Sequence, residues 1–307
     1  MIQLQGVGKV YGSLIKSRSV RALRDFSITM TPGEVFGIAG PNGAGKTTLL
    51  ALLLGFLRPT TGTIRIENTE PRAWTERHGV AYLSELIGIP RWWSAEGTLH
   101  RYGLLEDLGR EARTRQIEAV IELLGLAEHR KKRVSQLSKG NLQRLGLAQA
   151  LLSDSRLVIL DEPTHGLDPL WTQRFRDVVR DLRRPDRVII IASHNLDELE
   201  RLADRVAILD HGALVRVAAA DDLESEGSGV WRLVLLADHP ALAAHFPEAT
   251  RTVQVRELSY DVSGTIDDLN VRLQRALTAG LRIRAFFPAR SRLETAFRDA
   301  VGKGGAE

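Results

Sequence analysis

The chain of 307 residues contains no cysteine. Disulfide bonds and thiolate metal sites are therefore excluded, which fits a reducing cytoplasm. Long hydrophobic runs are also absent, because no stretch reaches the roughly 18 to 20 apolar residues that span a bilayer. The sequence starts directly with a strand-like segment at Met1–Leu4, so we expect no signal peptide. If the protein works at a membrane, another polypeptide must supply the spans.

A strong excess of charge of one sign is missing as well. The 42 Lys and Arg residues nearly balance the 38 Asp and Glu residues, which leaves a net charge of +4. Such a small excess predicts no nucleic-acid partner. The basic run Arg130–Arg133 is interpreted as a solvated segment. A hydrophobic content of 43% is ordinary for a globular protein, and the length fits one large or two modest domains.

A glycine-rich motif is the most informative feature that is present. Residues 40–48 read GPNGAGKTT and fill the pattern G-x-x-x-x-G-K-[ST]. The apolar run 35–39 predicts a buried strand before this loop, and the run 49–54 predicts a helix that ends near Gly55. Backbone N–H groups in such a loop can surround phosphate oxygens. The predicted nucleotide-binding residues of the loop are Gly40, Asn42, Gly43, Ala44, Gly45, Lys46, Thr47 and Thr48.

Two side chains of this loop have predicted chemical roles. Lys46 would add a cation near the β- and γ-phosphates, and Thr47 would offer its hydroxyl to Mg²⁺. The alternative is an ordinary glycine turn between a strand and a helix. The apolar flanks on both sides of the loop favour the phosphate-binding interpretation.

An acidic motif follows a second buried strand. The apolar run Leu157–Leu160 is followed by Asp161 and Glu162, which places two carboxylates at the C-terminal end of a strand. Open α/β sheets bind ligands at that edge. We predict that Asp161 holds Mg²⁺, directly or through water, and that Glu162 acts as a general base. Without the phosphate loop upstream, a strand ending in a solvated acidic turn would be equally plausible.

A third motif identifies a family. Residues 137–144 read LSKGNLQR and resemble the signature sequence of ATP-binding-cassette (ABC) ATPases, LSGGQ followed by x-Q-R. Ser138 and Gly140 match, whereas Lys139 and Asn141 depart from the commonest form. The resemblance implies that Ser138 and Gly140 face the γ-phosphate of ATP held by a second subunit. A serine and a glycine can cap a helix and admit a phosphate, although a cap without a partner is the alternative.

Further motifs follow in the order of the family. The sequence GLDP at residues 166–169 resembles the D-loop, in which Asp168 communicates between two sites. The apolar run 188–193 predicts a strand that ends at His194, the position of the family's switch histidine, which contacts the γ-phosphate. A lone histidine is more often only a polar residue at a strand end. The catalytic set that the resemblance implies is Lys46, Glu162 and His194.

Two positions differ from the family pattern. Glu85 stands where the Q-loop usually carries glutamine, a change that exporter-type members often show, and a carboxylate can still ligate Mg²⁺. The predicted metal ligands are therefore Thr47, Glu85 and Asp161. Tyr11 stands where an aromatic residue normally stacks on adenine. The stretch 12–20 is longer than usual, so ordinary strand packing is the alternative for Tyr11.

The predicted fold is α/β, with a phosphate-loop NTPase core of the ABC ATPase type at residues 1–222. It includes an antiparallel β subdomain and a helical subdomain at about 88–150. Within the latter, an apolar face with helical spacing predicts one helix, at Ile117, Val120, Ile121 and Leu124. A linker-like composition at 225–229 leads into a C-terminal accessory α+β domain at 223–307.

The accessory domain resembles the small α/β tail of many ATPases of ABC-type exporters. Its predicted element order is β-β-β-α-β-α. The segment Leu293–Phe297 matches the family's closing L-E-D-x-F motif at three positions. This tail is unlike the longer barrel-type regulatory domain of sugar-importer ATPases, so the resemblance favours an exporter.

The resemblance implies the ATP-hydrolysing subunit of an ABC transporter, peripheral at the cytoplasmic face of the cell membrane. Two copies would bind ATP head to tail, as a homodimer, and ATP-driven dimerisation would power separate transmembrane permease subunits. The implied cofactors are ATP and Mg²⁺. Trp92 and Trp93 follow Glu85 closely, and we expect them either to line the groove for a permease helix or to pack in the core.

Two other functions are considered. A soluble ABC ATPase acting on ribosomes or DNA is disfavoured, because this chain carries a single cassette, no coiled-coil insertion and no zinc-binding cysteine. A regulator that binds ATP without turnover is disfavoured by the presence of Glu162 and His194. The departures at Glu85, Lys139 and Asn141 could still slow hydrolysis.

Overall fold

The computed structural model describes residues 1–12, 19–106, 109–219, 228–254 and 257–289, together with Leu293 and Phe297. Contacts between Cα atoms divide the chain into two compact units, and the division falls between Ala218 and Ala219. Each unit has its own buried cluster of apolar side chains. The two units are described separately.

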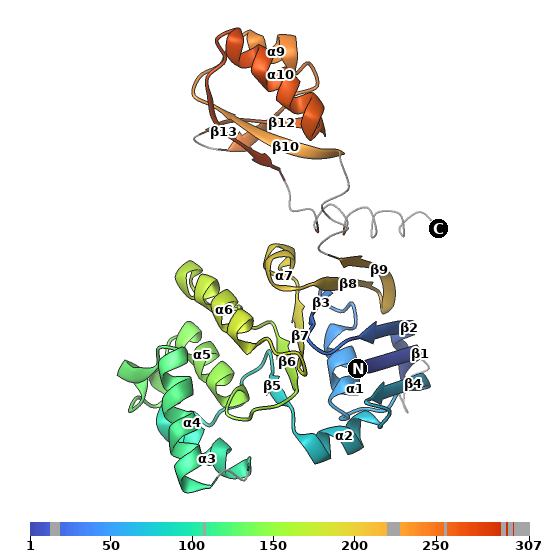
Figure 1. Ribbon diagram of the computed structural model, residues 1–307, viewed down its shortest axis with the longest axis vertical. Coiled ribbons are helices and arrows are strands. Elements are labelled where there is room, and N and C mark those ends of the chain that lie inside the picture. The colour runs from blue at the N-terminus through green and yellow to red at the C-terminus, as the bar shows by residue number, and fades with distance from the viewer. Residues whose placement is uncertain are drawn as a thin grey trace. The chain divides into compact units, whose positions relative to one another are not determined.

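In the described residues of the first unit, one mixed sheet has the strand order β4-β1-β2-β9-β8-β3-β7-β6-β5 (Figure 1). Strand β3 pairs in parallel with β7 and β8, and β6 pairs in parallel with β5 and β7. The strands are β1 (Ile2–Tyr11), β2 (Val20–Met30), β3 (Val35–Ala39), β4 (Thr61–Ile66), β5 (Ala81–Leu83), β6 (Leu157–Asp161), β7 (Val188–Ser193), β8 (Arg205–Asp210) and β9 (Ala213–Ala219).

The central strands are apolar on both faces, as is typical of strands in a parallel sheet. Every residue of β3, β6 and β7 is buried. Strands that other elements cover on both sides have nearly continuous apolar sequences, and these three strands do. Their parallel pairing brings three C-terminal ends to one edge of the sheet. That edge therefore receives the residues that follow each strand: Gly40, Glu162 and His194.

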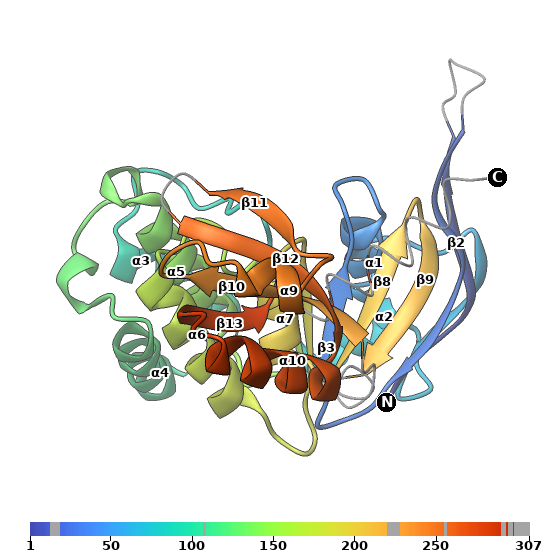
Figure 2. The same ribbon diagram turned by 90° about the horizontal axis from the view of Figure 1, so that it is seen from above.

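Strands at one end of the sheet pair antiparallel. Strand β1 pairs with β2 and with β4, and the alternation of buried and exposed residues in β4 shows that one face is solvated. Figure 2 shows β1 and β2 as one long twisted pair. This part of the fold is the antiparallel subdomain that the family resemblance implies.

Helices complete the first unit. Figure 1 shows α3, α4 and α5 grouped together at the β5 end, away from β1, β2 and β4. The predicted apolar face of α4 is confirmed, because Ile117, Val120 and Ile121 are buried. The helices are α1 (Lys46–Leu53), α2 (Pro71–His78), α3 (Ala95–Leu105), α4 (Arg110–Leu123), α5 (Lys139–Ala150), α6 (Pro169–Leu182) and α7 (Leu196–Leu202), with short 3₁₀ turns at Ala127–His129 and Val134–Gln136.

The second unit contains a four-stranded antiparallel sheet of order β11-β12-β10-β13 in its described part. Its core includes Leu233, Phe246, Val262 and Leu269. Trp231 stacks on Phe286 with ring centroids 5.1 Å apart. The elements are β10 (Ser228–Leu235), α9 (Ala241–His245), β11 (Thr250–Gln254), β12 (Glu257–Thr265), α10 (Ile266–Thr278) and β13 (Ile283–Pro288).

The element order of this unit corrects the prediction. The described residues have the order β-α-β-β-α-β of a split βαβ unit, so the predicted β-β-β-α-β-α lacks the helix α9 that follows the first strand. Helix α9 has five residues, too few to show a 3.6-residue period in the sequence. Most of the predicted last helix lies outside the described residues, as do positions 225–227 of the predicted linker. The remaining linker positions, 228 and 229, belong to β10.

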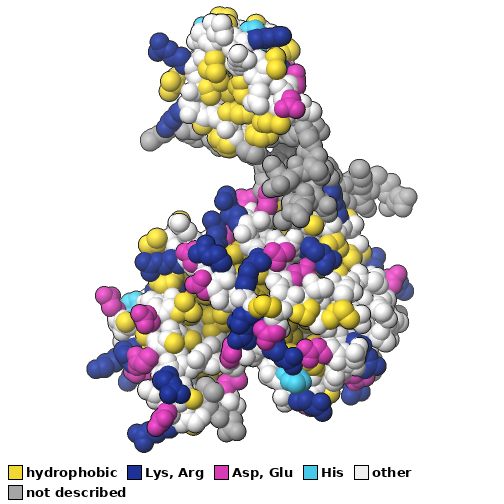
Figure 3. All heavy atoms as spheres, viewed as in Figure 1, with side chains coloured by type: hydrophobic (Ala, Val, Ile, Leu, Met, Phe, Trp, Pro, Cys, Tyr) yellow, Lys and Arg dark blue, Asp and Glu magenta, His cyan; other side chains and the backbone are white. Residues whose placement is uncertain are grey.

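The surface charges of the first unit and the apolar character of the helices are relevant to possible partners. Figure 3 shows acidic and basic side chains interspersed over the visible face of the first unit. Among the helices of the described residues, none has the length and apolar character needed to cross a membrane.

Candidate nucleotide-binding and hydrolysis site

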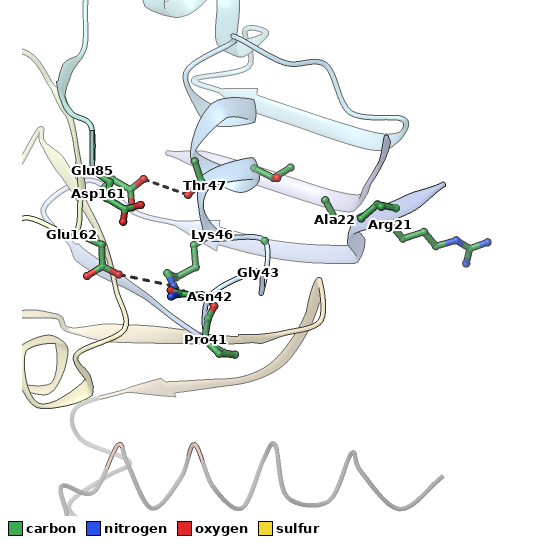
Figure 4. Close-up of a pocket in the computed structure, with 13 residues that line it drawn as sticks. Arg21, Ala22, Pro41, Asn42, Gly43, Lys46, Thr47, Glu85, Asp161 and Glu162 are labelled. Atoms are coloured by element: carbon green, nitrogen blue, oxygen red, sulfur yellow. Dashed lines mark hydrogen bonds and ion pairs between the residues drawn. The ribbon is translucent and has the colours of Figure 1, made fainter. Parts of the chain in front are cut away.

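A cavity of about 330 Å³ lies at the C-terminal ends of the central strands. Figure 4 shows Thr47, Glu85 and Asp161 close together, with Lys46 and Glu162 beside them and Arg21 pointing away. The lining residues are Val20, Arg21, Ala22, Pro41, Asn42, Gly43, Gly45, Lys46, Thr47, Thr48, Glu85, Asp161 and Glu162. The phosphate loop, the acidic motif and Glu85 are thus brought to one place, as their positions after strands predict.

The glycines of the loop allow a close backbone turn. Gly45 has a φ of +106°, and a Cβ added there would lie 2.5 Å from the carbonyl oxygen of Ala22. Gly45 precedes α1 without a side-chain cap. The first N–H groups of a helix have no intrahelical acceptor, so those at the start of α1 are free to bind phosphate oxygens.

Lys46 is held at the mouth of the loop. Its ammonium donates to the carbonyl oxygens of Gly40, at 2.7 Å, and Pro41, at 3.3 Å. The same Nζ lies 4.0 Å from Oε1 of Glu162, and the side chain is buried. The cation therefore lies between the phosphate loop and the predicted base, where it can neutralise charge that develops on a transferred phosphoryl group.

Oxygen ligands suited to Mg²⁺ gather next to Lys46. The Thr47 hydroxyl donates to Oδ2 of Asp161 at 3.5 Å. Burial, together with the negative charges of Glu85 and Glu162, raises the pKa of Asp161 to about 6. A site that crowds carboxylates in this way favours a cation. In the described residues, however, no three His, Cys, Asp or Glu side chains form a complete metal cluster. Phosphate oxygens and water would have to supply the other ligands.

Glu162 is oriented by the neighbouring strand β7. Its Oε2 accepts a hydrogen bond from the Ser193 hydroxyl at 3.0 Å, and its Oε1 accepts one from the His194 backbone N–H at 2.9 Å. Nδ1 of the His194 ring lies 2.8 Å from Oε1. Glu162 adopts φ +47°, a left-handed conformation that is unfavourable for a residue with a side chain. The strain is tolerated because these contacts fix the carboxylate.

Sequence reasoning misses two residues that support Glu162. It places Ser193 only within a strand, although the position directly before His194 is a usable signal. Gln143 is buried in α5, and its Nε2 donates to the carbonyl oxygens of Glu162, at 3.1 Å, and Pro163, at 3.0 Å. No local pattern predicts that contact, because it joins a helix to the end of a strand.

The signature residues do not line the cavity of their own chain. Ser138 caps α5 by accepting a hydrogen bond from Asn141 N–H at 3.3 Å. Gly140 fits closely against the loop after Glu162, because a Cβ there would lie 3.0 Å from the Gly166 carbonyl oxygen. Nζ of Lys139 lies 2.9 Å from Nε2 of His165 in the same loop. The α5 N-terminus is thus tied to the segment that follows the base.

Five other predicted residues also lie outside the cavity lining: Gly40, Ala44, His194, Asp168 and Tyr11. Asp168 caps α6 by accepting a hydrogen bond from the Trp171 N–H at 2.9 Å. Tyr11 is 41% exposed, and its hydroxyl lies 3.4 Å from Oγ1 of Thr48. The contact with Thr48 puts Tyr11 near the phosphate loop, but its role as an adenine platform stays a prediction. Part of the long stretch after Tyr11, residues 13–18, lies outside the described residues.

Comparison with known proteins agrees with this geometry. Residues 23–165 match the ABC transporter family. An uncharacterized ABC transporter ATP-binding protein of Synechocystis sp. is 34% identical over 283 residues, which cover 89% of this chain and 79% of that protein. The daunorubicin resistance ATP-binding protein DrrA3 of Streptomyces coeruleorubidus is 31% identical over 309 residues, covering 98% and 96%. Names of further relatives include both Nod factor export and methionine import.

Solved structures give the same fold. The first unit resembles a bacterial ABC transporter cassette solved as a dimer, with a TM-score of 0.66 and 21% sequence identity over 72% of this chain and 99% of the cassette. The chain belongs to the family of ABC transporter ATP-binding proteins. As a member of that family it binds ATP and is an ATPase.

Proposed function

We propose that this chain is the ATPase subunit of an ABC exporter and acts as a homodimer on a separate transmembrane permease. One observation supports the proposed dimer. Lys46 and Glu162 lie in the cavity, whereas Ser138 and Gly140 do not line it. A second copy, placed head to tail, would bring its signature helix N-terminus to the nucleotide. ATP then joins the two copies, and hydrolysis separates them.

In the proposed reaction, each group of this chain has one task. Thr47, Asp161 and Glu85 would hold Mg²⁺, which supplies positive charge to the phosphates when it is bound. Lys46 stabilises the same charge from the other side. The Glu162 carboxylate orients the attacking water and takes its proton. His194, next to Glu162, would sense the γ-phosphate.

A path from the permease to this site is proposed through the segment after β5. Leu86 is 84% exposed and Phe56 is 70% exposed, so both can receive a permease helix. Glu85, which directly precedes Leu86 in the sequence, lines the cavity. Ile87 packs against Gly146 of α5, where an added Cβ would lie 2.8 Å from its Cδ1. Movement at Leu86 would thus reach both the metal ligands and the signature helix.

The tryptophans of the predicted groove differ from each other. Trp92 is 73% exposed. Trp93 is half-buried, with the Arg101 guanidinium 4.7 Å from its ring centroid and Tyr102 against its edge. Trp93 therefore fits the alternative of core packing. A place for Trp92 in the permease groove stays a prediction.

The direction of transport and the location are parts of the same proposal. Two relatives that match nearly the whole chain carry a drug-resistance name and a Nod factor export name, which favours export. We place the ATPase at the cytoplasmic face of the cell membrane, bound peripherally to its permease, with no nucleic-acid partner. Residues 1–222 would form the nucleotide-binding domain, with the helical subdomain at about 88–150, and residues 223–307 would form an accessory domain.

The decisive experiment uses Glu162→Gln. The amide keeps an acceptor oxygen for Ser193 but cannot act as a base, so ATP is bound and not hydrolysed. Light scattering should then show a dimer in saturating MgATP and a monomer without nucleotide. A matched Lys46→Ala variant, which cannot hold the phosphates, should stay monomeric in both conditions. A Glu162→Gln protein that stays monomeric in MgATP would contradict the proposed dimer.

The transporter itself is tested by purification from detergent-solubilised native membranes, followed by mass spectrometry. A stoichiometric polytopic membrane protein is the expected partner. Ribosomal or DNA-bound partners would instead support the soluble ATPase that the sequence disfavours.

A further inference from the structure

Two segments that are far apart in the sequence, the second of them strongly basic, form one ribbon. Residues 91–96 pair antiparallel with residues 130–135. The backbone N–H of Val134 donates to the Trp93 carbonyl oxygen at 2.8 Å, and that of Ala95 donates to the Lys132 carbonyl oxygen at 3.0 Å. A bridge also joins Ser94 to Arg133. We call residues 91–96 and 130–135 the basic ribbon.

One cation of the ribbon is neutralised within the fold. Arg130 lies 2.6 Å from a carboxylate oxygen of Glu96 and 2.6 Å from one of Glu118. These two hydrogen bonds to carboxylates raise the pKa of Arg130 above its usual value. Arg130 thus neutralises the charge of Glu96, the only acidic residue among the twelve residues of the ribbon.

The other cations of the ribbon have no such partner. Their side chains belong to exposed residues, and none forms an ion pair with an acidic residue in the described part of the chain: Arg91, Lys131, Lys132 and Arg133. The interpretation of Arg130–Arg133 as a solvated segment is confirmed for Lys131, Lys132 and Arg133, which are exposed. Arg130 is paired, and the remaining three cations join Arg91 and the two tryptophans.

The ribbon presents one large aromatic ring outward. Trp93 and Val134 anchor the ribbon, because Val134 is buried and Trp93 packs against Arg101 and Tyr102. Trp92 is left 73% exposed. A single exposed apolar side chain is common on protein surfaces, so Trp92 is informative only together with the charges around it. The surface around it carries unpaired positive charge.

We propose that the basic ribbon binds the anionic headgroups of a membrane surface, with Trp92 at the headgroup level. Tryptophan rings favour the membrane–water interface, where one side is apolar and the other is wet. Lysine and arginine near an anionic leaflet are attracted to lipid phosphates. The ATPase would thus hold the membrane directly, in addition to its permease.

Composition favours lipid over an acidic protein segment. Protein interfaces are depleted in lysine, and their centres are depleted in charge. They also need about 800 Å² of complementary surface on each partner. The ribbon offers one exposed ring among four cations, two of which are lysines. That combination suits a fluid layer of phosphates better than a packed protein contact.

The test uses the purified full chain and lipid vesicles that contain no permease. The inference presumes the proposed membrane location, but this assay is independent of the permease and of export. We expect sedimentation with vesicles of equal phosphatidylglycerol and phosphatidylcholine, and none with pure phosphatidylcholine. Binding should weaken as salt rises, because counterions screen the attraction. Equal binding to both kinds of vesicle would overturn the proposal.

Variants identify the ribbon as the contact. Each cation near an anionic surface raises affinity about fivefold, so Lys131→Gln/Lys132→Gln should weaken vesicle binding roughly 25-fold. The matched control Arg77→Gln/Arg275→Gln removes the same charge from exposed positions on α2 and α10. It should bind as the unchanged chain does. Equal losses of vesicle affinity in both double variants would show that only the net charge of the protein matters. That result would contradict a binding site at the basic ribbon.

Trp92→Ala separates the aromatic contribution from charge. We expect weaker vesicle binding with an unchanged ATPase rate, since Trp92 does not line the cavity. If Trp92→Ala and Lys131→Gln/Lys132→Gln leave vesicle binding unchanged and instead weaken binding to a co-purified permease, the ribbon holds a protein segment. That result would reject the lipid proposal and leave the transporter function intact.

Discussion

At the residue scale, Ser193 and His194 at the end of β7 hold Glu162, the proposed general base. Ser193 and His194 are consecutive residues, and each supplies a hydrogen bond to a different oxygen of the same carboxylate. A strand places such a pair with little freedom, because its backbone is fixed by the sheet. The carboxylate of the proposed base is therefore positioned before any nucleotide binds, and such preorganised groups lower reaction barriers effectively.

Removing one of these hydrogen bonds should slow the chemical step. Ser193→Ala deletes the donor to Oε2 of Glu162, and one hydrogen bond to a charged group contributes about 1.5 kcal/mol or more. We expect kcat to fall about tenfold with the KM for ATP nearly unchanged. Steady-state kinetics provide the check, and Ser193→Thr, which keeps the hydroxyl, should restore most of the rate. A normal kcat for Ser193→Ala would show that His194 alone positions the base.

The raised pKa of Asp161 has a defined effect on stability. An acid with a pKa of about 6 in the folded chain, against an ordinary value of 3.8, binds its proton more tightly when folded. Between pH 4 and 6 this group therefore stabilises the metal-free fold as pH falls, and that stability is lost as pH rises through 6. A metal ion needs the ionised carboxylate, so protons compete with Mg²⁺ in the same range.

Glu85 is predicted to set the acidic limit of activity. Its charge helps to raise the pKa of Asp161. In Glu85→Gln that contribution is gone, so Asp161 stays ionised at lower pH. We expect the acidic limb of kcat/KM at subsaturating Mg²⁺ to shift downward by a fraction of a pH unit to about one unit. The pH profile of kcat/KM is measured between pH 4.5 and 8. An unchanged acidic limb would show that ionisation of Asp161 does not limit Mg²⁺ binding.

At the element scale, α5 connects the parts of the site. Its N-terminus carries the signature residues, Gln143 supports the Glu162 loop, and Gly146 receives the segment after β5. At Gly146, a Cβ would lie 2.8 Å from Ile87 Cδ1 and 2.9 Å from Leu83 Cδ1. Glycine in a helix costs helix propensity, so its use here is explained by close packing.

Gly146→Ala should therefore destabilise the first unit. Overpacking costs about 1–3 kcal/mol and helix propensity returns up to about 1 kcal/mol, so we expect a net loss of about 1–2 kcal/mol. Urea unfolding measures the loss. Gly88→Ala is the control, because a Cβ there meets nothing within 4 Å. Equal stability of the two variants would mean that Ile87 relaxes without cost.

Arg144 joins three helices through one buried guanidinium. Its Nη1 donates to the carbonyl oxygens of Leu124, at 3.1 Å, and Gly125, at 3.0 Å, which end α4. The Trp171 ring of α6 covers the guanidinium at 3.9 Å. Burial lowers the pKa of Arg144 from its usual high value. The side chain fixes the helical subdomain against the helix that follows the D-loop.

Loss of Arg144 should be costly. Arg144→Met leaves two carbonyl oxygens without their donor, and we expect a loss of about 2–4 kcal/mol in the free energy of unfolding. Arg174→Met is the matched control, because Arg174 lies over the same ring at 4.9 Å but is exposed. It should cost less than about 1 kcal/mol. Chemical denaturation compares the two variants. Equal losses in the free energy of unfolding would show that only the contact with the Trp171 ring matters.

At the scale of the whole molecule, the chain contains two units with separate cores. Each core is made only from residues of its own unit. Units of this kind are expected to unfold independently unless a large apolar interface joins them. The cavity is lined entirely by residues of the first unit, so the ATPase reaction needs no side chain from the second.

The shortened chain 1–222 is predicted to fold and to hydrolyse ATP. Calorimetry of the full chain should show two transitions, and the shortened chain should retain one of them at nearly the same temperature. An ATPase rate close to that of the full chain is expected. If the shortened chain is insoluble or inactive while the full chain is active, the second unit contributes to the nucleotide-binding fold.

Much of the site is determined by the sequence alone, because the motifs stand at the ends of apolar strands. An apolar run such as Val188–Ser193 predicts a strand buried on both faces, as in parallel sheets, and open α/β sheets bind ligands outside the carboxyl ends of such strands. This pattern is enough to place Lys46, Asp161 and Glu162 together. The helix over residues 110–123 is predictable for a similar reason, since its period is local.

Only the tertiary structure decided which distant side chains meet. Gln143 of α5 and Glu162 after β6 are joined by a hydrogen bond. Residues 91–96 pair with residues 130–135, although α3 and α4 separate these segments in the sequence. Local periodicity carries no information about such pairs, because packing and backbone pairing set them. The sequence thus determined the chemistry of the nucleotide site. The tertiary packing decided that β7 and α5 together hold Glu162, and that four cations and Trp92 share one surface.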